Sequence, residues 1–283
     1  MTMIASAPTQ SIDRVAQIFQ SALSEHPDYT TLNEEELKRF IAIEEARISG
    51  FEGLGQSPIK LSAAQAHSIG AIKVHSSVGS YDEPYKEDDN PRLKNIDWLA
   101  WADRDRIKHG AYLARKVAET RSGYTIPAYP LDRLHIQKEE TKALIREYGP
   151  NLIYTGYPVE TAKATEVLNR IGGIIPIEKC FIVHGTPRNT VEGIQQFILP
   201  EGALARDKEL AIVSHAPHLA RILHIMGQYP YLPAGSLPYV APVATPESGR
   251  LDFALMEIRG MLNYVFRDHV AAVQAHPYQT LAL

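Results

Sequence analysis

The residues best suited to chemistry lie in segment 210–221, LAIVSHAPHLAR. Its first half is a short apolar run typical of a buried strand, and the second half has the apolar spacing of a helix. Ser214, His215, His218 and Arg221 therefore lie at a predicted strand-to-helix junction. In an open α/β sheet, ligands bind in the crevice beyond the carboxyl ends of the strands. We therefore expect a functional site here.

The side chain types at this junction suggest different chemical roles. His218 or His215 could transfer a proton, since imidazole titrates near neutrality, or could simply form hydrogen bonds at a helix start. Arg221 could bind an anion with two parallel hydrogen bonds. Ser214 lacks the Gly-x-Ser-x-Gly context of a serine nucleophile. No acidic or thiol partner nearby completes a metal site with the two histidines, so we expect no metal.

Two more predicted strand ends carry polar or small residues. Gly156 follows one strand, and the stretch 184–190 follows the next. Glycine allows close backbone approach, and helix N-termini attract anions. The predicted ligand-binding residues are Gly156, Thr186, Arg188, Asn189, Thr190, Ser214 and Arg221.

Some of these positions have an ordinary structural interpretation as well. Asn189 and Thr190 are common N-cap residues. Glu160 and Glu192 fall in the first turns of predicted helices, where the helix dipole stabilises carboxylates. As catalytic candidates, these two glutamates would contact a hydroxyl or ammonium group of the ligand. The sequence leaves both interpretations open.

The elements that would position these residues alternate along the chain. Hydrophobic spacing predicts helices over 138–148, 160–171, 189–198, 217–226 and 251–269, and strands over 151–155, 179–184, 209–214 and 239–243. Such alternation favours parallel strands joined by right-handed helical crossovers. We therefore predict an α/β fold with a Rossmann-like, doubly wound, mainly parallel sheet.

The first part of the chain is mostly helical in pattern. Residues 11–50 have helical spacing, 70–79 has the pattern of a strand, and 95–119 that of a long helix. We predict an N-terminal helical extension over 1–65 and a Rossmann-like domain over 66–283. The apolar surface of the first helices could form a homodimer or pack on the sheet, and the sequence leaves both open.

Composition excludes several classes of protein. The net charge is −4 and the Lys and Arg residues are scattered, so the sequence has no cluster of basic residues of the kind that binds nucleic acid. Cys180 is the single cysteine, which excludes an internal disulfide and a zinc site with several thiolates. The sequence shows no secretory signal and no apolar run of about 18 residues, so we expect a cytoplasmic protein without a membrane partner. Neither Gly-x-Gly-x-x-Gly nor a P-loop occurs in 70–79.

Several motifs occur in the order found in a known family. They are 155–157 (TGY), 160–162 (ETA), 173–176 (GIIP), 188–193 (RNTVEG), 213–221 (VSHAPHLAR) and 239–242 (YVAP), followed by a closing helix with Glu257 and Tyr264. In this order the chain resembles the YdcF-like family, whose domain is shared with SanA and ElyC of bacteria. The resemblance covers about residues 150–265. It departs from the family pattern at Tyr157, at 184–185 and at Gly193.

The resemblance implies a Rossmann-like protein that binds a nucleotide-type or anionic ligand. The YdcF branch of the family is associated with S-adenosylmethionine binding, which implies this cofactor or a nucleotide here. Arg188 and Arg221 would then hold the anionic end, Asn189 and Thr190 would orient it, and His218 or His215 would move a proton. The alternatives are a phosphoanhydride or phosphoester hydrolase, and a sensor that binds a small molecule without converting it.

Overall fold

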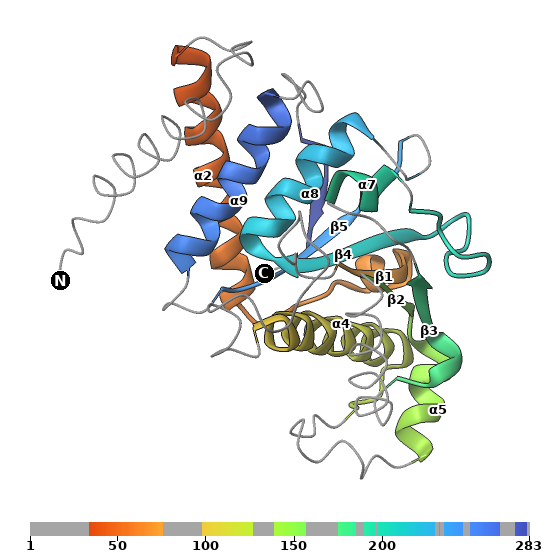
Figure 1. Ribbon diagram of the computed structural model, residues 1–283. Helices are drawn as coiled ribbons and strands as arrows, with labels where there is room; N and C mark the ends of the chain where they lie inside the picture. Colours follow the sequence, from red (N-terminus) through yellow and green to blue (C-terminus); the bar gives the residue numbers. More distant parts are fainter. Residues whose placement is uncertain are drawn as a thin grey trace, which may run out of the picture.

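A single parallel sheet forms the centre of the protein, which we describe from a computed structural model (Figure 1). The residues that the structure describes are 34–75, 98–126, 139–156, 175–184, 190–195, 197–229, 232, 235–245, 250–266 and 275–281. The strands are β1 (Ile69–His75), β2 (Asn151–Gly156), β3 (Cys180–His184), β4 (Glu209–His215), β5 (Tyr239–Val243) and β6 (Gln279–Thr280). Their order is β3-β2-β1-β4-β5-β6, and each neighbouring pair is parallel. This strand order is that of the Rossmann fold, which confirms the predicted fold class.

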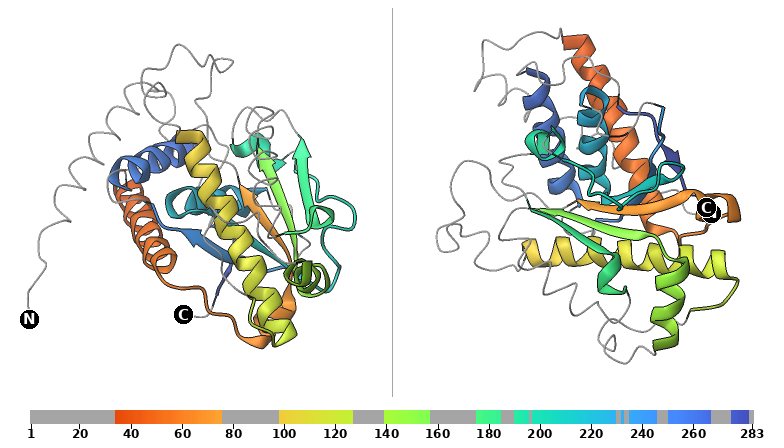
Figure 2. Two further views of the ribbon diagram at one scale, coloured as in Figure 1. Left: turned by 90° about the horizontal axis from the view of Figure 1, so that it is seen from below. Right: turned by 90° about the vertical axis from the view of Figure 1, so that its right-hand side faces the viewer.

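Helices cover both faces of the sheet (Figures 1 and 2). The helices are α2 (Glu34–Gln56), α3 (Ala63–Ser68), α4 (Trp98–Ser122), α5 (Glu139–Tyr148), α7 (Thr190–Gln195), α8 (Ala216–Gln228) and α9 (Arg250–Phe266), with a 3-10 turn, η2, at Ile177–Lys179. The core on one face includes side chains of α4 and α5, and the core on the other includes side chains of α2, α7, α8 and α9. No described helix is long and apolar enough to cross a bilayer.

The strands are apolar along most of their length because both faces are covered. In β1, Ala71 packs into the core beneath α8, whereas Ile72 and Val74 pack against the α4 side. The same alternation in β4 sends Ile212 toward α8 and Val213 toward α4. Parallel strands buried in this way have continuous rather than alternating hydrophobicity. That property explains why the strand pattern is clear in the sequence although its two faces are not distinguishable.

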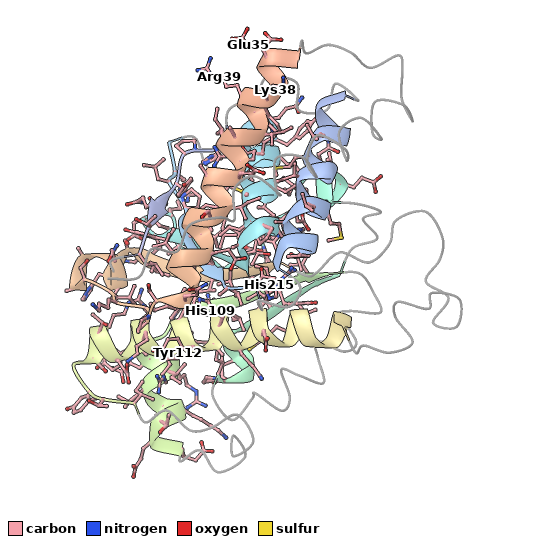
Figure 3. All side chains as sticks on the ribbon, turned by 90° about the vertical axis from the view of Figure 1, so that its left-hand side faces the viewer. Glu35, Lys38, Arg39, His109, Tyr112 and His215 are labelled. Carbon is pink, nitrogen blue, oxygen red and sulfur yellow. The ribbon has the colours of Figure 1, made fainter. Side chains whose placement is uncertain are left out.

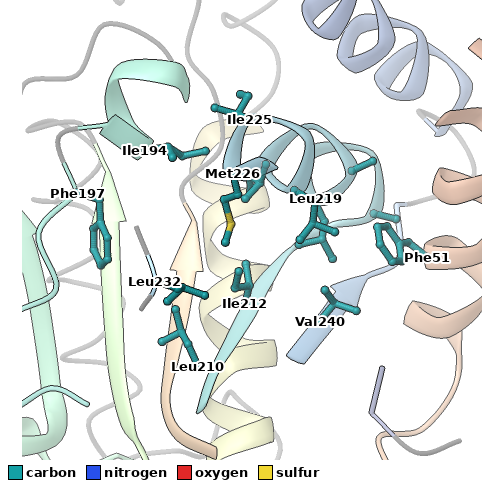
Figure 4. Packing of buried hydrophobic residues seen from close by; sticks show 14 of the residues in the cluster. Phe51, Ile194, Phe197, Leu210, Ile212, Leu219, Ile225, Met226, Leu232 and Val240 are labelled. Atoms are coloured by element: carbon teal, nitrogen blue, oxygen red, sulfur yellow. The ribbon is translucent and has the colours of Figure 1, made fainter. Parts of the chain in front are cut away.

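Helix α8 forms the centre of the larger core. Figure 4 shows Leu219 and Met226 pointing from α8 toward Ile212 and Val240 of the sheet. All four side chains are at most 1 % exposed. Burial of this kind contributes about 1.5–3 kcal/mol per large apolar side chain, so α8 is firmly attached. The first residue of α8 directly follows the end of β4, and the position of its N-terminus is therefore fixed as well.

Helix α2 belongs to the same core as α8. Phe51 of α2 is 2 % exposed, and the Glu52 carboxylate accepts a hydrogen bond of 2.8 Å from the Thr245 amide, just after β5. At Gly55 the two backbones approach so closely that a Cβ would lie 2.6 Å from the Ala244 nitrogen. Residues 34–56 thus pack against the sheet and its helices, while the predicted boundary at residue 65 remains a prediction.

Most predicted elements agree with the structure within a few residues. The predicted strand 70–79 is β1 as far as His75, and the predicted helix 189–198 is α7 over Thr190–Gln195; residues 76–79, 189 and 196 lie outside the described part of the chain. The predicted helix 160–171 lies outside the described residues. The sequence patterns missed α3 and β6, which have six and two residues. Elements this short have too few residues to establish a hydrophobic period.

Candidate active site

The candidate site lies at the carboxyl ends of β1 and β4. Strand order reverses between these two strands, and such a reversal is where ligands bind in doubly wound folds. The pairing of β1 with β4 runs through Val74 and Val213. One residue further, His75 and Ser214 come side by side, and both project to the α8 face. The sequence prediction placed a site at this edge but did not include β1.

Lys73, His75 and Ser214 are buried beneath α8, at 0 %, 7 % and 0 % exposure. The Lys73 Nζ lies 3.4 Å from the centre of the Phe197 ring, and burial places the pKa of Lys73 well below its usual value. The pKa of His75 is also lowered well below normal, chiefly by burial and then by the charges of Lys73, His218 and Arg106. The His75 imidazole is therefore neutral at physiological pH.

Two buried polar atoms in this group have no hydrogen-bond partner among the described residues. They are Nε2 of His75 and Oγ of Ser214. A buried polar group without a partner costs about 1–3 kcal/mol, and a ligand, an ion or an ordered water can supply the missing partner. Both atoms lie where the fold type places its ligands.

His218, Arg221 and Glu257 form a buried charged cluster beside this pair. The Arg221 Nε lies 2.7 Å from one Glu257 oxygen, and the Arg221 Nη2 lies 3.4 Å from the other. The His218 Nδ1 lies 2.9 Å from Arg221 Nη2 and 3.2 Å from Glu257 Oε1. Burial lowers the pKa of His218 to about 4 in spite of Glu257. Burial raises the pKa of Glu257, but Arg221 and His218 outweigh burial and hold that pKa below normal.

Arg106 of α4 joins the ends of the two strands from the opposite face. Its Nε donates to His215 Nδ1 at 2.8 Å, and its Nη1 donates to the His75 carbonyl oxygen at 3.0 Å. Because an arginine nitrogen only donates, neutral His215 carries its proton on Nε2. The pKa of His215 is well below normal, first through burial and then through Arg106, His218 and His109. Figure 3 shows His215 and His109 near the sheet side of α4.

Helix α8 adds backbone donors to the site. The first N–H groups of a helix have no intrahelical partner, and the N-cap residue His215 supplies no side-chain hydrogen bond to them. Pro217 has no N–H, so the donors at this end include those of Ala216 and His218. Ser214, His75 and this helix end together could bind an oxyanion such as a phosphate or a carboxylate. In the described part of the chain, no three His, Cys, Asp or Glu residues gather closely enough to hold a metal ion.

The structure brings together four of the predicted site residues: Ser214, His215, His218 and Arg221. The guanidinium of Arg221 contacts Glu257 and His218, which is the geometry of a positioning residue. Gly156 ends β2, on the other side of β1 from β4. Thr190 and Glu192 lie in α7, whose contacts reach α8. Glu160, Thr186, Arg188 and Asn189 lie outside the described residues.

The sequence interpretation missed His75, Lys73 and Arg106 as site residues. His75 lay inside a predicted strand that continued to residue 79, so it was not recognised as a strand end. Lys73 interrupts the apolar run of β1, and a cation in such a run is the signal that could have identified it. Arg106 gives no such signal, because a basic residue in a long helix is usually solvated.

The chain was compared with known protein families, curated proteins and solved structures. No protein-family model, no curated protein and no solved structure matches this chain. The fold follows from the strand order, and the chemistry follows from the side chains at the ends of β1 and β4. Function is therefore inferred from the site itself.

Proposed function

We propose that this protein is an enzyme that binds a nucleotide-type anionic ligand or S-adenosylmethionine in the crevice at the ends of β1 and β4. There it would act on a small-molecule substrate. A cytoplasmic location and membership of the YdcF-like family belong to the same proposal. The observation that supports it most strongly is the pair of buried polar atoms, His75 Nε2 and Ser214 Oγ, at the switch point of a Rossmann-type sheet.

A ligand with an anionic end would compensate for the cost of these two atoms. A phosphate or carboxylate oxygen would accept a hydrogen bond from Ser214 Oγ and from His75 when its proton is on Nε2. The same oxyanion would face the positive end of the α8 dipole. A nucleotide offers a phosphate for this position, and S-adenosylmethionine offers a carboxylate.

His218 is the residue best placed to move a proton. Its imidazole is in contact with the Glu257 carboxylate through Nδ1, at 3.2 Å, and a carboxylate in this position orients an imidazole for acid–base work. This contact favours a second candidate function, hydrolysis of a phosphoester or phosphoanhydride. Release of inorganic phosphate from a nucleotide panel would identify that reaction.

The test is a binding and turnover screen with the purified protein. S-adenosylmethionine and a nucleotide panel would be added while thermal stability is followed, and mass spectrometry would detect conversion. A ligand at 100 times its Kd stabilises the native state by about 2.7 kcal/mol, which gives a clear shift in Tm. Conversion would establish an enzyme, whereas binding without conversion would favour a sensor. No shift with any compound would overturn the proposal.

A variant pair makes the assignment specific to this site. We expect Ser214→Ala to weaken binding about tenfold or more, which corresponds to loss of one hydrogen bond to a charged group. Ser57→Ala is the matched control, because the Ser57 hydroxyl bonds to the Gly53 carbonyl within an exposed helix end. Equal affinity of both variants would place the ligand elsewhere.

A further inference from the structure

His218 has a hydrogen-bond partner ready for either state of its Nδ1 atom. Arg221 Nη2, at 2.9 Å, donates to Nδ1 when this atom carries no proton. Glu257 Oε1, at 3.2 Å, accepts from Nδ1 when the atom is protonated. When Nδ1 is protonated, Arg221 keeps its ion pair with Glu257, in which Arg221 Nε lies 2.7 Å from the carboxylate. Protonation of Nδ1 would place two donors 2.9 Å apart, so Arg221 Nη2 must move away from Nδ1 while Arg221 Nε keeps its contact with Glu257.

Five elements bring titratable groups close to His218. His75 is on β1, Arg106 is on α4, His215 is on β4, Arg221 is on α8 and Glu257 is on α9. Burial and the positive groups keep His218 neutral, and Glu257 is the described carboxylate whose charge opposes them. A second negative group beside His218 would shift this balance toward the imidazolium.

We infer that His218 takes up a proton when an oxyanion with two negative charges binds beside His75 and Ser214, so that the site selects a phosphate monoester. This inference rests on the proposed function and names its ligand class. The proton comes from solvent and resides on Nδ1, where it is donated to Glu257. The Nε2 proton of the resulting imidazolium is then available to a phosphate oxygen.

Charge separates the ligand classes that the proposed function leaves open. A phosphate monoester has a second pKa of about 6 and carries nearly two negative charges at pH 7. A phosphodiester carries one negative charge, and S-adenosylmethionine has a carboxylate together with an ammonium and a sulfonium group. Of these three, the monoester has the charge needed to retain a proton on His218.

Isothermal titration calorimetry in buffers of different ionisation enthalpy counts the protons taken up on binding. The probes are inorganic phosphate and adenosine 5′-monophosphate, and the matched control is adenosine 3′,5′-cyclic monophosphate, a monoanion. Near pH 7.5 we expect the monophosphate to bind with uptake of about one proton, so that affinity rises about tenfold for each unit that pH falls toward 6.5. Uptake below about half a proton would overturn the inference.

Variants assign the proton to its residue. His218→Asn and Glu257→Gln should both abolish uptake, whereas His224→Asn, which changes another buried histidine of α8, should leave it intact. Uptake that persists in a folded His218→Asn variant would overturn the assignment. If that variant does not fold, nitrogen NMR of the unaltered protein decides: a His218 Nδ1 that stays unprotonated with monophosphate bound contradicts the inference.

The outcomes also separate this inference from the function on which it rests. Binding of S-adenosylmethionine without binding of either phosphate probe would overturn the phosphate inference and leave the proposed function standing. Binding of the monophosphate without proton uptake would have the same effect. If no compound binds, both fail together.

Discussion

His218 and His224 lie on the same helix, six residues apart, and burial lowers the pKa of each to about 4. Their surroundings differ. His218 lies between a guanidinium and a carboxylate. His224 packs edge-on against the Phe40 ring, with ring centres 5.3 Å apart, and neither ring nitrogen has a hydrogen-bond partner in the described part of the protein.

The comparison shows that a lowered pKa alone does not identify a site. The same cause, loss of water around the ring, acts on both histidines. Only at His218 does a carboxylate stand ready to stabilise the charged form, and only His218 is in the first turn of α8, at the strand ends. This contrast supports the role proposed for His218, whereas His224 packs between α8 and α2.

Loss of the carboxylate beside His218 should have the largest effect. Glu257→Leu leaves the buried Arg221 charge uncompensated, so we expect a loss of about 3–5 kcal/mol in the free energy of unfolding. Urea denaturation measures this loss. The double variant with Arg221→Met should recover much of it, because both charges are then gone. Strictly additive losses in the two single variants and the double would show that the pair is not coupled.

The histidines should also make the protein sensitive to acid. The folded-state pKa of His224 is lowered from 6.5 to about 4, so the unfolded chain binds more protons between these values. Stability is therefore complete above pH 6.5 and is lost as pH falls toward 4, by about 2–3 kcal/mol for one such group. Unfolding free energies measured from pH 7 to 4 should show a smaller loss in His224→Leu than in the unaltered protein. Identical pH profiles would mean that His224 already titrates normally.

Gly260→Ala tests how closely α9 holds the His218 cluster. A Cβ at Gly260 would lie 2.7 Å from Arg221 Nη1, so the guanidinium must shift. Alanine favours a helix by about 1 kcal/mol over glycine, which should offset most of the strain and keep the net stability change within about 1 kcal/mol. Ligand affinity should fall severalfold, as titration calorimetry would show. Unchanged affinity would mean that His218 does not depend on the position of Arg221.

Ser214→Ala should have a small effect on stability, and one of the opposite sign. The Ser214 hydroxyl is fully buried and its Oγ has no partner among the described residues. Its removal loses no hydrogen bond and ends the cost of burying an unpaired hydroxyl, so the unfolding free energy should rise by about 1 kcal/mol. Chemical denaturation without ligand checks this value. A loss of 2 kcal/mol or more, about the cost of a broken buried hydrogen bond, would show a structural role instead.

The sequence predicted the elements of the fold well, because buried parallel strands and amphipathic helices produce clear local patterns. Tyr239–Val243, for example, is a strand with the predicted bounds. The junction at Ser214 and His215 was also predicted, since an apolar run there ends in polar residues. The order of strands in a sheet is not encoded by local patterns. The sequence therefore did not show that β1 lies beside β4, and His75 was recognised as a site residue only in the structure.

The partners of the site residues could not be predicted for a related reason. Arg106 and His215 are separated by 109 residues, and His218 and Glu257 by 39. Such contacts depend on how helices cross the sheet, which spacing along the chain does not encode. Arg221 illustrates the limit: its type suggested an anion contact, but the charge that it contacts in the structure is Glu257.

The docking of α2 has a consequence for the order in which the chain folds during synthesis. Phe51 packs into a core to which α8 contributes the most side chains, and α2 also contacts β5. Strand β5 begins about 180 residues after α2 ends. Translation proceeds at roughly 5–20 residues per second, so about 10 to 40 s pass between the synthesis of α2 and that of β5. During this time the apolar face of α2 is not covered by β5. Helix α2 is therefore synthesised early but packs late. Its apolar face stays exposed for most of the time that the chain is being translated.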